Sequence, residues 1–275
     1  MRDFMADRIA ALKSGKMTKS QKILLEYFEL GKYEEIIYMS ITQLAEATGV
    51  AEATVLRFCR SLGFDGYQEF KLFLAQNMVP ATKSSCGTEY VDEIISNYQT
   101  DLEYSRTKLS SQRIDKAIDM ILAARAICLC GAGHSHLAAL EMHNCLLKMG
   151  ILSYCEQDMH IQNILLSSRS SEDLLVIFSV SGGTKDVIEI AEQARACGMK
   201  IILVTCYEKS PVSRLADLVI VCAPKESPAG PGAISSTIMQ FFIVNVICEG
   251  IRLRDTERFD AMIAKGNAAT SKKLV

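Results

Sequence analysis

The chain has 275 residues, which is enough for two domains that each bury a core, and its 49% hydrophobic and 23% charged residues are typical of a globular protein. The formal net charge of −2 excludes a globally basic nucleic-acid-binding protein, so any such contact must be local. Ten cysteines are scattered without a CxxC pair, which excludes zinc-ribbon and thioredoxin-like sites and favours buried thiols in a reducing cytosol.

The first residues, MRDFMADRIAALKSGK, are amphipathic and charged, and they lack the apolar core of a signal peptide. The longest apolar stretch, Ile234–Cys248, is interrupted by polar residues and is shorter than the roughly 18–20 residues that span a bilayer. We therefore expect a cytoplasmic protein with no membrane partner.

Residues 1–77 are predicted to be all helical. One helix covers Thr18–Leu30, and a second runs from Ser40, an N-cap type, to Gly49, a C-cap type. After a short turn a third helix covers Ala51–Leu62. Two short helices joined by a glycine-containing turn are typical of a helix-turn-helix.

The second helix of such a pair enters the DNA major groove by its N-terminal turns. Arg57 could donate to a guanine edge or a phosphate, and Lys71, on a helix predicted over Gln68–Gln76, is a further phosphate contact. Basic and acidic residues balance over residues 1–79, so a helical protein-binding module is the alternative. The predicted DNA contacts are Ser40, Glu52, Ala53, Thr54, Arg57, Arg60 and Lys71.

The stretch MSITQLAEATGVAEATVLRFCRSLGFDGYQEFKLFLA is similar to the N-terminal domain of the RpiR family of bacterial transcription regulators. The resemblance rests on the elements S-I-x-x-L-A-x-x-x-G-V, E-A-T-V-x-R-F-C and L-G-F-x-G-Y-x-E-F-K, and it implies operator DNA as a partner. The family usually carries Ser where this chain has Ala51, the cap of the recognition helix, and losing a cap costs about 0.5–2 kcal/mol.

Residues 78–112 are predicted to form a linker, rich in small polar residues over Met78–Glu89, and a connecting helix that breaks near Ser110. Beyond them, five apolar runs alternate with amphipathic helices, which predicts an α/β domain over 113–252 with a parallel five-stranded sheet covered by helices on both faces. A C-terminal helix and tail occupy 253–275. The predicted strands are Ala126–Cys130, Ile151–Cys155, Leu174–Ser179, Lys200–Thr205 and Leu218–Cys222.

The loop Ser179–Thr184 lies between a predicted strand and a predicted helix, an arrangement that binds anions at the helix N-terminus. Gly182 and Gly183 let the backbone approach a ligand, and no lysine occupies the Walker position, which excludes a nucleotide-triphosphate loop. The pattern predicts a cradle for one phosphate, with an ordinary strand–helix turn as the alternative.

A second glycine-containing loop, Gly131–His136, also follows a strand, and its Gly-x-Gly alone is a weak dinucleotide signal. Together the two loops, GAGHSH and SVSGGTKDV, resemble those of the sugar isomerase (SIS) domain. The resemblance implies phosphate contacts from Ser179, Ser181 and Thr184 and a sugar contact from Ser135. The predicted effector-binding residues are Gly133, Ser135, Ser179, Ser181, Gly182, Gly183 and Thr184, and further pocket residues are His134, His160, Ser235 and Ser236.

No cofactor is expected, and a metal held by His134, His136 and His143 is disfavoured because two of them lie in a loop. Ile234–Ile238 begins the last helix of the domain without an acidic residue, where isomerising members tend to carry one. Glu141, His136 and Glu249 are candidate bases by type alone.

We therefore predict a non-enzymatic bacterial transcription regulator whose operator binding responds to a phosphorylated sugar or amino sugar. A homodimer or homotetramer is expected, because two-fold-related heads match a palindromic operator. The alternatives are a phosphosugar isomerase with a helical appendage and a metabolic sensor that does not bind DNA.

Overall fold

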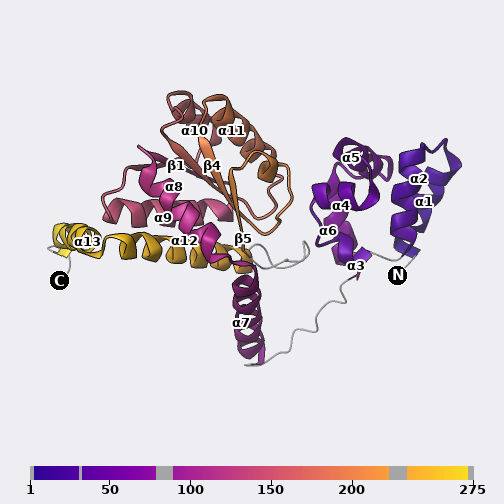
Figure 1. Ribbon diagram of the computed structural model, residues 1–275. Coiled ribbons are helices and arrows are strands. Elements are labelled where there is room, and N and C mark those ends of the chain that lie inside the picture. The colour runs from indigo at the N-terminus through magenta and orange to yellow at the C-terminus, as the bar shows by residue number, and fades with distance from the viewer. Residues whose placement is uncertain (1–2, 31–32, 79–88, 223–233, 272–275) are drawn as a thin grey trace. The chain divides into compact units, whose positions relative to one another are not determined.

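The computed structural model describes residues 3–30, 33–78, 89–222 and 234–271. The chain divides into two compact units. The boundary falls inside helix α7 (Glu89–Lys108), between residues 97 and 98. The first unit is helical, and the second contains the sheet (Figure 1). The predicted order of an all-helical part followed by an α/β part is confirmed.

Aromatic rings fill the core of the helical unit. Phe28 stacks on Phe58 with ring centroids 5.4 Å apart and meets Phe70 edge-on at 5.1 Å, and all three side chains are buried. These rings join three helices that are separate in the sequence. The helices are α1 (Asp3–Ser14), α2 (Lys19–Glu29), α3 (Tyr33–Ile36), α4 (Ile41–Thr48), α5 (Glu52–Ser61) and α6 (Tyr67–Met78).

Local side-chain contacts set the ends of these helices. Thr18 and Ser40 each form a reciprocal capping box with the glutamine three residues later, at the starts of α2 and α4. Gly49 ends α4 in the left-handed conformation at φ 67°, which a side chain would disfavour. The predicted helix boundaries are thereby confirmed to within a few residues.

Five parallel strands form one sheet in the order β2-β1-β3-β4-β5. The central strands β1 and β3 are buried along their whole length, which explains why their sequences are apolar without alternation. The strands are β1 (Ile127–Gly131), β2 (Ser153–Cys155), β3 (Leu174–Phe178), β4 (Lys200–Thr205) and β5 (Leu218–Val221).

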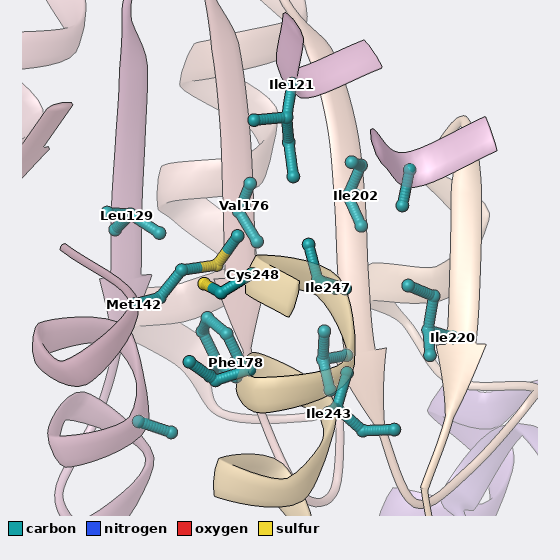
Figure 2. Packing of buried hydrophobic residues seen from close by; sticks show 14 of the residues in the cluster. Ile121, Leu129, Met142, Val176, Phe178, Ile202, Ile220, Ile243, Ile247 and Cys248 are labelled. Carbon is teal, nitrogen blue, oxygen red and sulfur yellow. The ribbon is translucent and has the colours of Figure 1, made fainter. Parts of the chain in front are cut away.

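Helices cover both faces of this sheet. On one face Met142 of α9 and Ile247 of α12 pack with Leu129, Val176 and Ile202 (Figure 2). On the other face, residues of α10 and α11 pack with the alternate side chains of the same strands. The helices of this unit are α8 (Ser111–Ala123), α9 (His134–Lys148), α10 (Met159–Ser167), α11 (Lys185–Ala196), α12 (Ile234–Arg254) and α13 (Thr256–Ser271), with a short 3-10 turn, η1 (Val212–Arg214).

Several predicted boundaries shift. The second strand begins at Ser153 instead of Ile151, and α6 begins at Tyr67 and reaches Met78. The predicted helix break is present, because Ser110 is the N-cap of α8. Most of the predicted linker lies outside the described residues.

Helix α12 is long and apolar enough, by length and composition, to cross a membrane: it has 21 residues, with a mean hydropathy of 1.5 in its most apolar window. Half of that window is buried inside the structure. The core helix of a globular domain has the same properties, and α12 packs against the sheet in this way.

Candidate functional site

The order of the strands identifies the edge where a ligand is expected. From β1 the chain passes to β2 on one side and later to β3 on the other, so the direction of the connections reverses between β1 and β3. Ligands of open parallel sheets bind beyond the carboxyl ends of the strands at such a point. The two predicted loops follow β1 and β3, whose last residues, Gly131 and Phe178, are register partners.

The β3–α11 loop, Ser179–Thr184, is held by its own hydroxyl groups. The Ser179 Oγ accepts from the Gly182 N–H at 3.1 Å, and the Ser181 Oγ accepts from the Gly183 N–H at 3.2 Å. Thr184 is the N-cap of α11, but its side chain makes no capping hydrogen bond. The positive end of α11 is therefore available to an anion at the predicted phosphate position.

Gly182 must be a glycine for two reasons. Its φ of 57° lies in the left-handed region, and a Cβ there would overlap the Ser210 Oγ and lie 2.7 Å from the Ser210 Cβ. The Gly182 carbonyl also accepts from the Val212 N–H at 3.0 Å. The backbone of the loop is thus pressed against the connection that follows β4.

Thr205, the last residue of β4, and Ser210, in the connection that follows it, both lie against this loop. The Thr205 Oγ1 donates to the Val180 carbonyl at 3.1 Å, and the Thr205 and Ser210 side chains are completely buried. Their sequence positions carried no signal of this role, because the contact exists only when β4 lies beside β3. The support holds the loop in one conformation before any ligand arrives.

The β1–α9 loop is the second part of the site. Gly133 is the N-cap of α9 at φ 57° and provides no side-chain cap, so this helix also presents an uncapped N-terminus. A Cβ on Gly131 would lie 2.5 Å from the Ser135 carbonyl oxygen, so glycine permits the tight turn into α9. Ser135 is buried, whereas Gly133 and His134 are exposed.

The remaining predicted pocket residues lie on α10 and α12. His160 is exposed in the first turn of α10, where the Asp158 carboxylate accepts from its N–H at 2.8 Å. That carboxylate already caps α10, so this helix N-terminus is not an anion site. Ser235 is half-buried and Ser236 is buried in the first turn of α12.

Two of the three histidines considered as metal ligands, His136 and His143, have separate partners. The His136 Nδ1 lies 4.0 Å from the Cys155 Sγ, and the His143 Nδ1 lies 2.9 Å from the Ser153 Oγ. Over the described ranges no cluster of three or more His, Cys, Asp or Glu residues could hold a metal ion.

The candidate DNA-reading face is the exposed side of α5. Ala53, Arg57 and Arg60 are exposed, while Val55 and Phe58 pack into the core. The Arg57 Nη2 donates to the Thr54 Oγ1 at 3.1 Å, so these two predicted contacts lie together. The Arg60 Nε donates to the Asp65 carbonyl at 3.2 Å.

The start of α5 is fixed by a side chain other than its cap. Ala51 occupies the N-cap position without a capping hydrogen bond, as expected for an alanine. Glu52 instead accepts a hydrogen bond from the Thr42 hydroxyl of α4, which ties the two helices of the motif together. The Ser40 hydroxyl is engaged at the start of α4, where it accepts from the Gln43 N–H at 3.1 Å.

The predicted phosphate contact by Lys71 is wrong. The residue is only 3% exposed, and its Nζ donates to the Met39 carbonyl at 2.8 Å. Lys71 lies on the same face of α6 as the buried Tyr67, Phe70 and Leu74. That helical spacing was the sequence signal that it points into the core.

Burial also makes Lys71 a source of pH-dependent stability. Desolvation lowers the pKa of its ammonium group from 10.5 to about 8. Between these values the unfolded chain binds more protons than the native chain, so the free energy of unfolding should rise with pH, by up to roughly 3 kcal/mol. Buried cysteines such as Cys59 and Cys128 have raised pKa values and act in the opposite direction in the same window, so the difference between the wild type and Lys71→Met isolates the lysine. Measured by urea unfolding at both ends of the window, the free energy of unfolding should change more favourably with rising pH in the wild type than in Lys71→Met. Equal pH dependence in the two proteins would contradict the lowered pKa of Lys71.

Comparisons with known proteins match both units. The family model for the helix-turn-helix domain of the rpiR family matches residues 5–81, and the model for the SIS domain matches residues 120–249. An uncharacterised HTH-type transcriptional regulator of Clostridium perfringens is 31% identical over 242 residues, which is 84% of this chain and 86% of the relative. The HTH-type transcriptional regulator HexR of Pseudomonas aeruginosa is 30% identical, over 87% of this chain and 86% of HexR.

A solved structure has a similar fold over almost the whole chain. The Vibrio vulnificus NanR protein, complexed with ManNAc-6P, aligns with a TM-score of 0.88 at 22% sequence identity. The alignment covers 99% of this chain and 100% of NanR.

Proposed function

Because this chain belongs to the RpiR family of helix-turn-helix transcriptional regulators that carry a SIS domain, we propose that it binds operator DNA through α5 and that a phosphorylated sugar at the β1–β3 edge modulates this binding. The observation that carries the effector part is the pair of uncapped helix N-termini, α9 and α11, on neighbouring strands at the point where strand order reverses.

A single phosphate group suits the loop Ser179–Thr184. The helix dipole and free backbone N–H groups of α11 favour negative charge, and the hydroxyl groups add neutral donors. A phosphosugar contacts both loops, with its phosphate beside α11 and its sugar toward the β1–α9 loop. The NanR structure, which contains a phosphorylated amino sugar, supports this ligand class for the same fold.

Binding without turnover is the better proposal for this site. The first turn of α12 contains no acidic residue, and Glu249 lies near the other end of that helix in an ion pair with Arg252 at 2.7 Å. Hydrogen bonds from Arg252 hold the pKa of the Glu249 carboxyl below its usual range, which makes it a weaker base. The named relatives are regulators, which agrees with this proposal.

We further propose that two copies act together on a palindromic operator in the cytoplasm. An effector shifts DNA affinity only if it binds one arrangement of the two reading heads better than another. Helix α7 supplies a surface for association, because Val91, Ile94, Ile95 and Leu102 are exposed apolar residues on one helix. Its acidic first turns and basic last turn also favour an antiparallel partner of the same sequence.

The test begins with DNA selected from a random pool by the full-length protein. Fluorescence anisotropy at physiological salt should show tighter binding to a two-fold-symmetric site than to one half-site. Hexose 6-phosphates, with their 2-amino and 2-acetamido forms, are then added, and one of them should change the operator Kd at least about fivefold, a coupling of about 1 kcal/mol. The unphosphorylated sugars should not.

Each part of the proposal can fail separately. Failure to enrich any DNA would overturn operator binding, and enrichment without a response to any phosphosugar would overturn the effector. Turnover of a hexose phosphate by the purified protein would favour the isomerase alternative.

A further inference from the structure

Two buried glutamines of the α/β unit have amide atoms without hydrogen-bond partners in the part of the chain that the structure describes. Gln240 of α12 has neither Nε2 nor Oε1 paired, and Gln162 of α10 has Nε2 unpaired. Both side chains are completely buried. A buried polar group left unpaired costs about 1–3 kcal/mol, so these amides lower the stability of the unliganded fold.

Gln240 lies on the stripe of α12 that faces the sheet. It precedes the buried Ile243, Ile247 and Ile251 at helical spacing, and Figure 2 shows Ile243 and Ile247 packed against the strands. The core around this stripe is apolar, with Met239 and Val244 among its neighbours in the sequence. A residue needed here only for packing would be apolar.

The same stripe places Gln240 at the carboxyl edge of the sheet. Figure 2 shows Ile247 near the level of Val176 and Ile243 closer to the level of Phe178, the last residue of β3. Helix α12 therefore runs opposite to the strands. One turn before Ile243, about 4.5 Å along the helix axis, Gln240 lies at the level of the loop that follows β3.

Gln162 reaches the same edge from the other face of the sheet. Its Oε1 accepts from the Glu156 N–H at 3.2 Å, and Glu156 directly follows β2. Strand β2 pairs with β1, whose loop forms the second part of the site. The unpaired Nε2 of Gln162 is therefore a buried donor beside the carboxyl end of β2.

We infer that Gln240 is a specificity-determining residue, whose amide binds the hydroxyl groups of the sugar part of the effector, with Gln162 as an additional donor. A carboxamide offers both donors and an acceptor, which matches hydroxyl groups that donate and accept in turn. The inference rests on the proposed phosphosugar function. It assigns the phosphate to the Ser179–Thr184 loop and the sugar to the amides of Gln240 and Gln162. Neither glutamine belongs to the two loop motifs recognised in the sequence.

The test compares Gln240→Met with the wild type, because methionine has a similar volume and no amide. Isothermal titration with the tightest-binding member of the hexose phosphate panel should show affinity at least about tenfold weaker, the effect of losing about 1.4 kcal/mol. The affinity for inorganic phosphate should be unchanged. Without ligand, the variant should unfold at the same urea concentration as the wild type or at a higher one, because an unpaired buried amide has been removed.

Asn245→Ala is the matched control, because Asn245 is exposed on the same helix, and it should match the wild type in both assays. A Gln240→Met protein that is less stable yet binds the phosphosugar normally would overturn the inference and make Gln240 structural. Gln162→Met should also weaken phosphosugar binding and leave inorganic phosphate binding unchanged, although its free energy of unfolding should fall because the Glu156 N–H loses its acceptor. These two affinities decide the question if Gln240→Met fails to fold. If the wild type binds no phosphosugar, the proposed function fails with the inference, whereas wild-type binding with unaffected variants refutes the inference alone.

Discussion

Replacing Gly182 with alanine should abolish the response to the phosphosugar while leaving operator binding intact. The new Cβ would occupy the space of the buried Ser210 side chain, and the residue would keep an unfavourable φ of 57°. The left-handed conformation alone costs a non-glycine residue about 1–2 kcal/mol, so the loop must move away from its supporting contacts. Calorimetric titration should show at least about a hundredfold loss of phosphosugar affinity, which corresponds to about 2.7 kcal/mol.

Two further variants test whether the effect comes from the overlap with Ser210 or from any loss of glycine in this loop. Alanine at Gly183 meets no atom closer than the Ser181 Oγ at 3.8 Å, so Gly183→Ala should leave the free energy of unfolding close to the wild-type value. Adding Ser210→Gly to Gly182→Ala removes the obstructing side chain and should restore part of the lost affinity. Normal phosphosugar binding by Gly182→Ala would show that the loop is not the phosphate site.

Replacing Arg57 with alanine should weaken operator binding about 5- to 150-fold, the effect of losing about 1–3 kcal/mol from one arginine contact. Arg57 is exposed on α5, and its hydrogen bond to Thr54 holds the guanidinium group beside the N-terminal turns of that helix. Anisotropy titrations at several salt concentrations should separate a base contact from a phosphate contact. Loss of a phosphate contact lowers the salt slope by about one unit and affects all sequences alike.

Lys13→Ala is the charge-matched control for this experiment. Lys13 belongs to the same helical unit and pairs with Glu29 at 2.7 Å, so its removal takes away one positive charge outside α5. Operator affinity should stay within about twofold of the wild type, because exposed ion pairs contribute little. Equal losses in the two variants, or none in Arg57→Ala, would refute the assignment of α5 as the reading helix.

The helix-turn-helix keeps its geometry although Ala51 cannot cap the start of α5 with its side chain. The start of α5 has no capping side chain, yet Glu52 bonds to Thr42 across the turn. A contact between the two helices thus stabilises the end of α5 that we propose enters the groove. The sequence showed the missing cap, whereas the compensating contact depends on the packing of α4 against α5.

The sequence by itself determined the elements and the main loop of the site. Apolar residues at helical spacing and in uninterrupted runs specify which segments are helices and which are buried strands, because each pattern must match a periodicity of the backbone. Glycine and hydroxyl residues in Ser179–Thr184 predicted an anion-binding turn, because conformational freedom and hydrogen-bonding capacity are properties of the residues themselves.

Only the tertiary structure decided which residues meet. The order of the strands places the β1 and β3 loops side by side, and the packing of β4 beside β3 brings Ser210 against Gly182. Lys71 is buried because the Met39 carbonyl offers its ammonium a partner. The burial of the unpaired Gln240 amide likewise depends on the packing of α12 against the face of the sheet. Burial and hydrogen-bond pairing depend on neighbours distant in the chain, and no local pattern contains that information.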